Sequence, residues 1–257
     1  MRQPTLAWNN FPPYRRAVQI IRSIAPALTA AAGLLLVGPL AGCDAAAHAI
    51  EGIQSAPSNS ARQPVGGGSA REVAQALAQL ESIPVKGRAQ KTGYTRDEFG
   101  PAWADTDHNG CDTRNDILAR DLTGETFKPG TNNCVVMTGT LVDKYTGTTI
   151  NFVRGQDTSS EIQIDHVVPL SDDWQKGAQQ LSTDQRQELA NDPLNLMAAD
   201  GPTNSAKGDK DAATWLPPNK AFRCEYVERQ TAVKAKYGLW VTRAEHDALA
   251  SVLEGCS

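Results

Sequence analysis

Two short apolar runs separated by a long polar stretch constrain the fold of this chain most. Ile162–Val168 is rich in β-branched residues, which predicts a strand, and Leu194–Ala198 predicts a second strand. Between them, the polar segment Leu170–Asp192 predicts a loop with one helix. Asp200–Thr203 predicts a turn, and a helix containing Lys207 is expected to follow it. The order strand, loop, strand, helix indicates an α+β domain.

The first 43 residues (1–43) predict an export signal. Several arginines precede the apolar segment Ile24–Ala41, and the stretch ends with Leu40-Ala41-Gly42-Cys43. This ending resembles the lipobox of bacterial lipoproteins, in which the cysteine thiol is lipidated, so Cys43 is the predicted lipidation site. Ordinary cleaved secretion and a retained membrane anchor are the alternatives, although prolines and glycines disfavour a spanning helix. All three place the remaining chain outside the cytoplasm.

The rest of the chain divides into a tether and one domain. Residues 44–83 are rich in small and polar residues, which predicts a flexible tether, with a short helix expected within Arg71–Ser82. Residues 84–257 are numerous enough for a single core. Within them, Cys134–Asp143 and Thr148–Val153 predict a β-hairpin, and helices are expected near the C-terminus.

Four cysteines follow Cys43, and export favours disulfide bonds among them. Four cysteines allow three pairings. The sequence-local pairs, Cys111 with Cys134 and Cys224 with Cys256, are favoured. A zinc site is the alternative, but the chain has no Cys-x-x-Cys spacing.

Helix signals support the second pair. One helix is expected to begin at Pro217–Asn219, and a capping box of Thr242 with Glu245 predicts the start of another. If these helices run antiparallel, Cys224 lies beside Cys256.

Polar side chains of a particular kind accompany the two predicted strands. Asp165 and His166 are adjacent, and Asn195, Asn204 and Lys207 follow in order. A carboxylate beside an imidazole, followed by two amides and a lysine, suits hydrolysis of a phosphodiester around one divalent cation. The net charge of −4 does not by itself indicate nucleic-acid binding, but basic residues outnumber acidic ones between Asn204 and Arg243. A basic face or an ordinary solvated helix surface both fit that excess.

These residues carry a family resemblance. The segments Asp165–Pro169, Asn195–Ala198 and Asn204–Gly208 resemble the HNH nuclease superfamily, especially its Asp-His…Asn…Asn variant, which also occurs in the HNH domain of CRISPR RNA-guided nucleases. The longer stretch Tyr94–Cys256 is similar to exported actinobacterial HNH-family proteins related to the C-terminal domain of GmrSD restriction endonucleases. The resemblance implies a ββα-metal unit inside the α+β domain.

The resemblance also implies roles for the metal ligands. Asp165 and Asn204 would bind a divalent cation through oxygen atoms, which favours Mg²⁺, or Mn²⁺, over Zn²⁺. Asn204 stands where many HNH enzymes have a histidine, so this departure bears on the identity of the metal. No organic cofactor is expected.

The remaining roles concern proton transfer and phosphate binding. His166 would be the general base, because an imidazole titrates near neutral pH. Asn195 would hold the imidazole or fix its strand, and Lys207 would contact a phosphate. Each assignment has a structural alternative: a hydrogen-bonded Asp165-His166 pair, a turn amide at Asn195, a helix N-cap at Asn204 and a surface charge at Lys207.

The segment Asp105–Asp116 places acidic and amide residues at the spacing of a calcium-binding EF-hand loop. Its last position is aspartate where the motif has glutamate, so a disulfide-held turn with Asx hydrogen bonds is favoured over a Ca²⁺ site. Arg114, in the same segment, is a second predicted phosphate contact.

The sequence therefore predicts an exported, membrane-anchored endonuclease acting on nucleic acid, with DNA favoured. A ribonuclease with the same site and a catalytically idle surface-binding lipoprotein are the alternatives. The enzymatic interpretation requires that Asp165 and Asn204 face one cavity beside His166.

Overall fold

The structure is a computed structural model that describes residues 70–256. The predicted export signal, the lipidation site at Cys43 and the tether before residue 70 lie outside the described residues and stay predictions. Within residues 70–256, no helix combines the length and apolar character needed to cross a bilayer.

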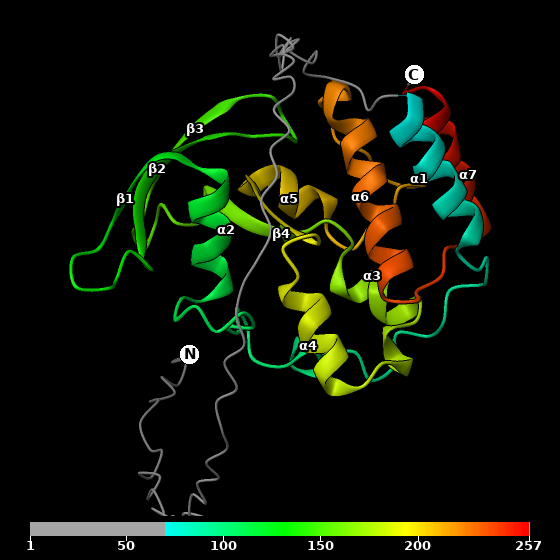
Figure 1. The fold of residues 1–257 in the computed structure, drawn as a ribbon, viewed down its shortest axis with the longest axis horizontal. Coiled ribbons are helices and arrows are strands. Elements are labelled where there is room, and N and C mark those ends of the chain that lie inside the picture. The colour runs from blue at the N-terminus through cyan, green and yellow to red at the C-terminus, as the bar shows by residue number, and fades with distance from the viewer. Residues whose placement is uncertain (1–69, 257) are drawn as a thin grey trace, which may run out of the picture. The chain divides into compact units, whose positions relative to one another are not determined.

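The described chain is a mixed α+β fold with two small antiparallel sheets (Figure 1). Its elements, in chain order, are α1 (Ala70–Ser82), η1 (Arg96–Phe99), α2 (Thr113–Asp121), β1 (Thr123–Phe127), β2 (Val136–Val142), β3 (Thr149–Val153), β4 (Ile162–His166), α3 (Leu170–Gln175), η2 (Ala178–Gln180), α4 (Thr183–Asn191), β5 (Leu196–Asp200), α5 (Gly201–Lys207), η3 (Lys220–Phe222), α6 (Arg223–Lys236) and α7 (Arg243–Glu254).

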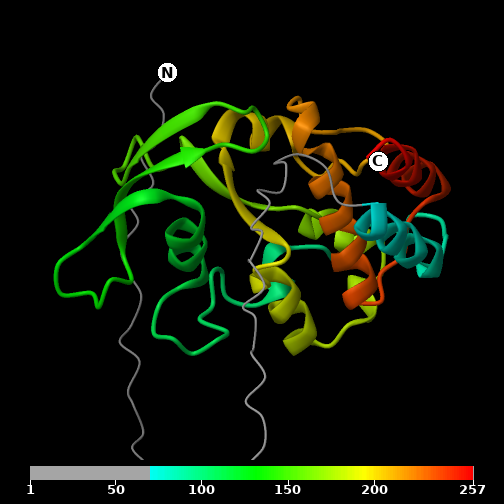
Figure 2. The same cartoon turned by 45° about the horizontal axis from the view of Figure 1, so that its top comes forward.

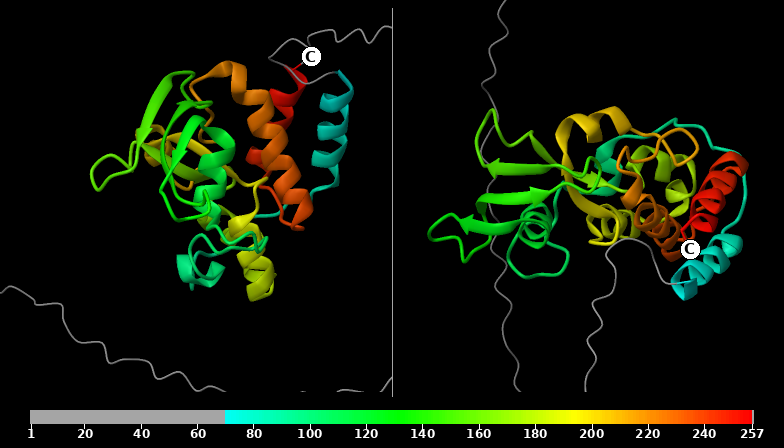
Figure 3. Two further views of the ribbon diagram at one scale, coloured as in Figure 1. Left: turned by 60° about the vertical axis from the view of Figure 1, so that its left-hand side comes forward. Right: turned by 90° about the horizontal axis from the view of Figure 1, so that it is seen from above.

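The elements form two ends with a ribbon between them. The sheet β1-β2-β3 lies at one end, with α2 packed against β2 (Figure 2). Helices α1, α6 and α7 pack together at the other end (Figure 3). The antiparallel ribbon β4-β5 and helix α5 lie between the two ends (Figure 1).

Strand β5 of the ribbon is apolar on both faces because both are covered. In β5, Leu196 and Ala198 pack with the residues of α2 and the three-stranded sheet. Met197 and Ala199 alternate with them and pack with the residues of α1, α6 and α7. Burial on both faces explains the continuous apolar run that predicted this strand.

Helix α5 begins earlier than the sequence indicated. Its N-cap is Asp200, whose carboxylate accepts a hydrogen bond from the Thr203 amide at 2.8 Å. The alternative interpretation of Asn204 as the helix N-cap is therefore wrong, and Asn204 lies inside the helix. Gly201 is required at the first position because a Cβ there would lie 2.1 Å from the Ser160 carbonyl oxygen.

A buried ionic network joins α3, α6 and α7. The Lys176 ammonium lies 2.7 Å from Asp172 and 2.5 Å from Glu245, and the Lys234 ammonium lies 3.1 Å and 2.8 Å from the same two carboxylates. All four side chains are essentially inaccessible to solvent. Buried charges persist only when they are paired, so these contacts fix the helices relative to one another.

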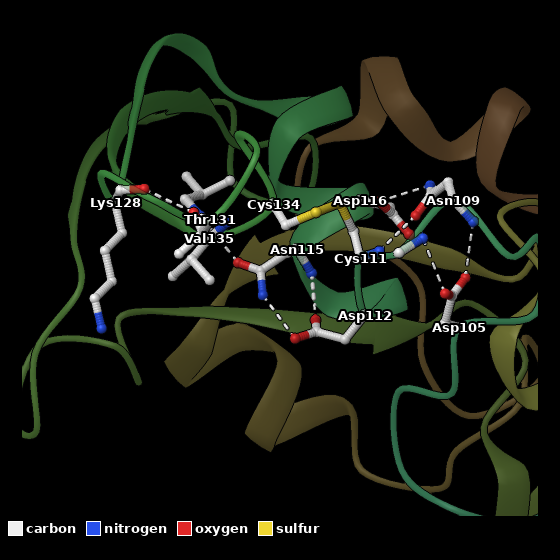
Figure 4. The surroundings of a disulfide bond; sticks show 12 residues. Asp105, Asn109, Cys111, Asp112, Asn115, Asp116, Lys128, Thr131, Cys134 and Val135 are labelled. Atoms are coloured by element: carbon white, nitrogen blue, oxygen red, sulfur yellow. Dashed lines mark hydrogen bonds between the residues drawn. A yellow bond between two sulfur atoms is a disulfide. The ribbon is translucent and has the colours of Figure 1, made fainter.

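Two disulfide bonds have the favoured sequence-local pairing. The Cys224–Cys256 bond joins the start of α6 to the segment that follows α7. Cys111–Cys134 lies beside the N-terminus of α2, where Asp112 caps the helix by accepting from the Asn115 amide at 2.8 Å (Figure 4).

Removing the second disulfide should destabilise the fold. The Cys224–Cys256 bond closes a loop of 32 residues in the unfolded chain, and a loop of that size corresponds to about 3–4 kcal/mol of stability. We expect the double variant Cys224→Ser/Cys256→Ser to lose that amount of unfolding free energy, which lowers its urea unfolding midpoint. An unchanged unfolding midpoint would show that the bond does not form in the folded protein.

Candidate active site

A cleft of about 620 Å³ brings together four of the residues that the sequence singled out. Asp165 and His166 at the end of β4, Asn204 on α5 and Arg114 on α2 all line it. The other two, Asn195 and Lys207, lie behind this lining and are fully buried. The arrangement satisfies the spatial requirement that Asp165 and Asn204 share a cavity beside His166.

The His166 imidazole has a defined protonation state. Its Nε2 lies 2.8 Å from the Ala190 carbonyl oxygen. A carbonyl can only accept a hydrogen bond, so Nε2 carries the proton and Nδ1 remains as the proton acceptor. Burial lowers the pKa of His166 to about 3, and the charges of Arg96 and Lys207 act in the same direction. The imidazole is therefore neutral at pH 7, and it is a weaker base than the near-neutral titration expected from the sequence implied.

Asn195 fixes the strand that carries the histidine. Its side-chain oxygen accepts a hydrogen bond from the Val168 amide at 2.8 Å, and its side-chain nitrogen donates to the Val168 carbonyl at 3.3 Å. Its own carbonyl accepts from the Val167 amide at 2.7 Å. All these contacts go to backbone groups, as expected both for fixation of the backbone after His166 and for the alternative of a purely structural amide. The imidazole is bound by the Ala190 carbonyl and not by Asn195.

Asp165 is held by two buried donors. The Tyr145 hydroxyl donates to its Oδ2 at 2.5 Å, and the Lys207 ammonium lies 2.9 Å from Oδ1 and 2.7 Å from Oδ2. Burial and the neighbouring Asp165 charge raise the pKa of Tyr145 well above its ordinary value, so the hydroxyl keeps its proton and stays a donor.

Lys207 has a different role from the predicted one. Its side chain is fully buried, and its ammonium also donates to the His166 carbonyl at 2.6 Å. Lys207 is thus the counter-ion of Asp165 and ties α5 to β4, in place of the expected phosphate contact or surface charge. The helix position alone did not reveal this inward direction.

Asn204 lines the cleft from helix α5. Its side-chain nitrogen donates to Gln163 Oε1 at 2.9 Å, which leaves its Oδ1 as an acceptor. The Oδ1 atom of Asp165 accepts from Lys207 and retains a lone pair. One carboxylate oxygen and one amide oxygen fit a Mg²⁺ ion that keeps several of its waters. Within residues 70–256, no three His, Cys, Asp or Glu side chains are grouped to hold a metal, so a fully protein-coordinated zinc does not fit there.

Two arginines supply positive charge to the cleft. The Arg114 guanidinium is partly buried and lies 3.4 Å from the carbonyl oxygens of Ser159 and Ile162. Burial lowers its pKa from the ordinary value, but an arginine remains charged. Arg96, on η1, also lines the cleft and is exposed. Sequence reasoning missed Arg96 because it belongs to no spacing motif.

The acidic loop Asp105–Asp116 is organised by hydrogen bonds among its own backbone and side-chain groups (Figure 4). The Asp105 carboxylate accepts from the amides of Asn109 at 3.1 Å and Gly110 at 3.0 Å. The Asn109 side chain donates to Asp116 at 3.2 Å. These contacts are those of the disulfide-held turn with Asx hydrogen bonds, and calcium binding in this loop stays a prediction.

A lysine substitution distinguishes a counter-ion from a phosphate contact. Lys207→Met leaves the Asp165 carboxylate buried without its ammonium, so we expect a loss of about 3–5 kcal/mol in unfolding free energy. The matched control is Lys210→Met, because Lys210 is exposed on the segment after α5; its effect should stay within about 0.5 kcal/mol. Equal stability of the two variants in urea unfolding would refute the counter-ion role.

Comparison with known proteins places the chain in a family. Residues 112–252, more than half of the chain, match the family model described as GmrSD restriction endonucleases, C-terminal domain. A fungal protein from Arthroderma benhamiae, described as an uncharacterized secreted protein, is 38% identical over 179 residues, which cover 69% of this chain and 82% of the relative. No solved structure matches the chain. The chain therefore belongs to the family of GmrSD restriction endonuclease C-terminal domains, a nuclease-related family.

Proposed function

We propose that this protein is an exported, metal-dependent endonuclease of the HNH type that hydrolyses phosphodiester bonds, with DNA as its substrate. The observation that carries the proposal is the shared cleft of Asp165, His166 and Asn204. Membership in a nuclease-related family supports it. In this proposal, the ribbon β4-β5 with helix α5 is the ββα-metal unit, because its order and its polar residues match that arrangement.

Asp165 and Asn204 would hold the divalent cation, with Mg²⁺ favoured over Mn²⁺ and Zn²⁺. When bound, the cation would supply a positive charge that offsets the negative charge of the scissile phosphate. Lys207 orients Asp165 and offsets its charge, since its ammonium contacts both carboxylate oxygens. Asn195 acts on the same site indirectly, by fixing the backbone that follows His166.

His166 would move the proton. A water oxygen attacks phosphorus and forms the new P–O bond, while the water proton passes to Nδ1 of His166. The P–O bond to the leaving sugar oxygen breaks, and that oxygen takes a proton from solvent. The Ala190 carbonyl keeps Nε2 protonated, so the imidazole presents the correct nitrogen throughout.

Arg96 and Arg114 would hold the substrate backbone. Both line the cleft that contains His166, and guanidinium groups match the geometry of phosphate oxygens. This assignment keeps the predicted role of Arg114 and gives Arg96 the role first expected for Lys207.

The location of the protein is proposed from three observations. The two disulfide bonds suit an oxidising compartment. The fungal relative is described as secreted. The sequence ending at Cys43 has the form of a lipid-attachment signal. The first two support export from the cytoplasm, and the third supports attachment to the membrane through a lipid on Cys43.

The central test is cleavage of nucleic acid by the full-length protein. We expect nicking or linearisation of plasmid DNA with Mg²⁺, no cleavage with EDTA, and a loss of at least about 100-fold for His166→Ala. His108→Ala is the matched control, because His108 lies in an exposed loop. Cleavage of RNA alone would support the ribonuclease alternative. Binding without any cleavage would support the idle surface module, and cleavage that survives EDTA would contradict the metal role.

If Arg96 and Arg114 hold the substrate backbone, removing either one should weaken DNA binding and make that binding less dependent on salt. In the His166→Ala background, which keeps the substrate intact, Arg96→Ala and Arg114→Ala should each lower DNA affinity and reduce the salt slope by about 1. Arg243→Ala, an exposed position on α7, is the matched control. Fluorescence anisotropy at several salt concentrations measures both quantities. An unchanged slope for Arg96→Ala would remove Arg96 from the substrate site.

A further inference from the structure

Trp103 has an unusual backbone conformation beside the proposed catalytic base. Its φ is +58°, in the left-handed region that bulky side chains rarely occupy. The other non-glycine residues with positive φ in the described chain are His108, Asn132 and Asn133, and Trp103 alone among them lines the cleft. Such a conformation costs free energy and persists only where the surrounding structure holds it.

The indole ring lies nearly parallel to the His166 imidazole. The two ring centroids are 6.0 Å apart and the interplanar angle is 16°. The hydrogen bond from Nε2 to the Ala190 carbonyl fixes one atom of the imidazole but does not by itself define the plane of the ring. An aromatic surface parallel to the ring restricts its rotation about the Cβ–Cγ bond.

The backbone around Trp103 is anchored to the start of α2. The Thr113 amide donates to the Trp103 carbonyl at 3.3 Å, and the Thr113 hydroxyl donates to the Ala104 carbonyl at 2.5 Å. Thr113 is buried and is the first residue of α2, next to its cap Asp112. The position of Trp103 is therefore determined by an element that the Cys111–Cys134 disulfide also holds.

We infer that Trp103 is a positioning residue for His166. Its ring sets the plane of the imidazole, so that Nδ1 faces the cleft and accepts the proton of the attacking water. This inference rests on the proposed function, since it assigns a partner to the proposed base. A tryptophan in the cleft could have either of two roles. An indole that orients the base affects turnover, whereas an indole that stacks on a nucleobase affects substrate binding.

Kinetics of the full-length protein on DNA test the inference. Trp103→Ala should lower kcat by about 10-fold to 100-fold with little change in KM, because a small displacement of a catalytic group has an effect of that size. Trp103→Phe keeps an aromatic surface and should recover most of the rate. In the His166→Ala background, Trp103→Ala should cause no further loss, since residues that act as a unit are not additive. A raised KM with unchanged kcat would overturn the inference.

A second measurement does not depend on cleavage. The indole ring current should shift the ring-proton resonances of His166 in NMR spectra, and His166→Ala identifies those resonances by their loss. Trp103→Ala should move them, while the control Trp240→Phe should not, because Trp240 donates to the Gly87 carbonyl and does not line the cleft. If the wild type cleaves no nucleic acid, the proposed function fails and the NMR result still decides the contact. If the His166 resonances stay unchanged in a folded Trp103→Ala protein, the positioning role fails.

Discussion

The buried ion pair between Lys207 and Asp165 is the interaction on which the site depends. It joins the last residue of α5 to β4, and the same ammonium binds the backbone carbonyl of His166. Asn204 lies three residues earlier on α5, so it is on the same side of the helix as Lys207. A buried charge without a partner is costly, so the pair holds helix α5 against β4. The position of α5 in turn determines where the Asn204 amide lies.

The ribbon β4-β5 gives this pair a rigid base. An isolated two-stranded ribbon is marginally stable, but here the residues of α2 cover one face and those of α6 and α7 cover the other. Alternation along β4 sends Asp165 toward Tyr145 and His166 toward Trp103. The proposed metal ligand and the proposed base therefore have separate supporting contacts, although both line one cleft.

The elements predicted correctly are those whose own residues carry a strong local signal. The two ribbon strands have apolar runs, and α7 begins at the capping box of Thr242 and Glu245. The elements that were missed lack such signals. Helix α2 buries the polar residues Thr113 and Asn115 on its packed face, so it shows little apolar periodicity. Strand β1 contains Gly124 in the left-handed region and pairs with an irregular register.

The sequence by itself determined the α+β class, the ribbon, the local order of Asp165, His166, Asn195 and Asn204, and the family to which they point. Those features depend on neighbouring residues, whose spacing fixes strand, turn and helix. The tertiary structure alone decided the direction of Lys207, the donation of His166 to Ala190, the approach of Trp103, and the burial of Lys176 and Lys234. Lysines are ordinarily exposed, and contacts between segments far apart in the chain arise only when the whole core packs, so no local pattern encodes them.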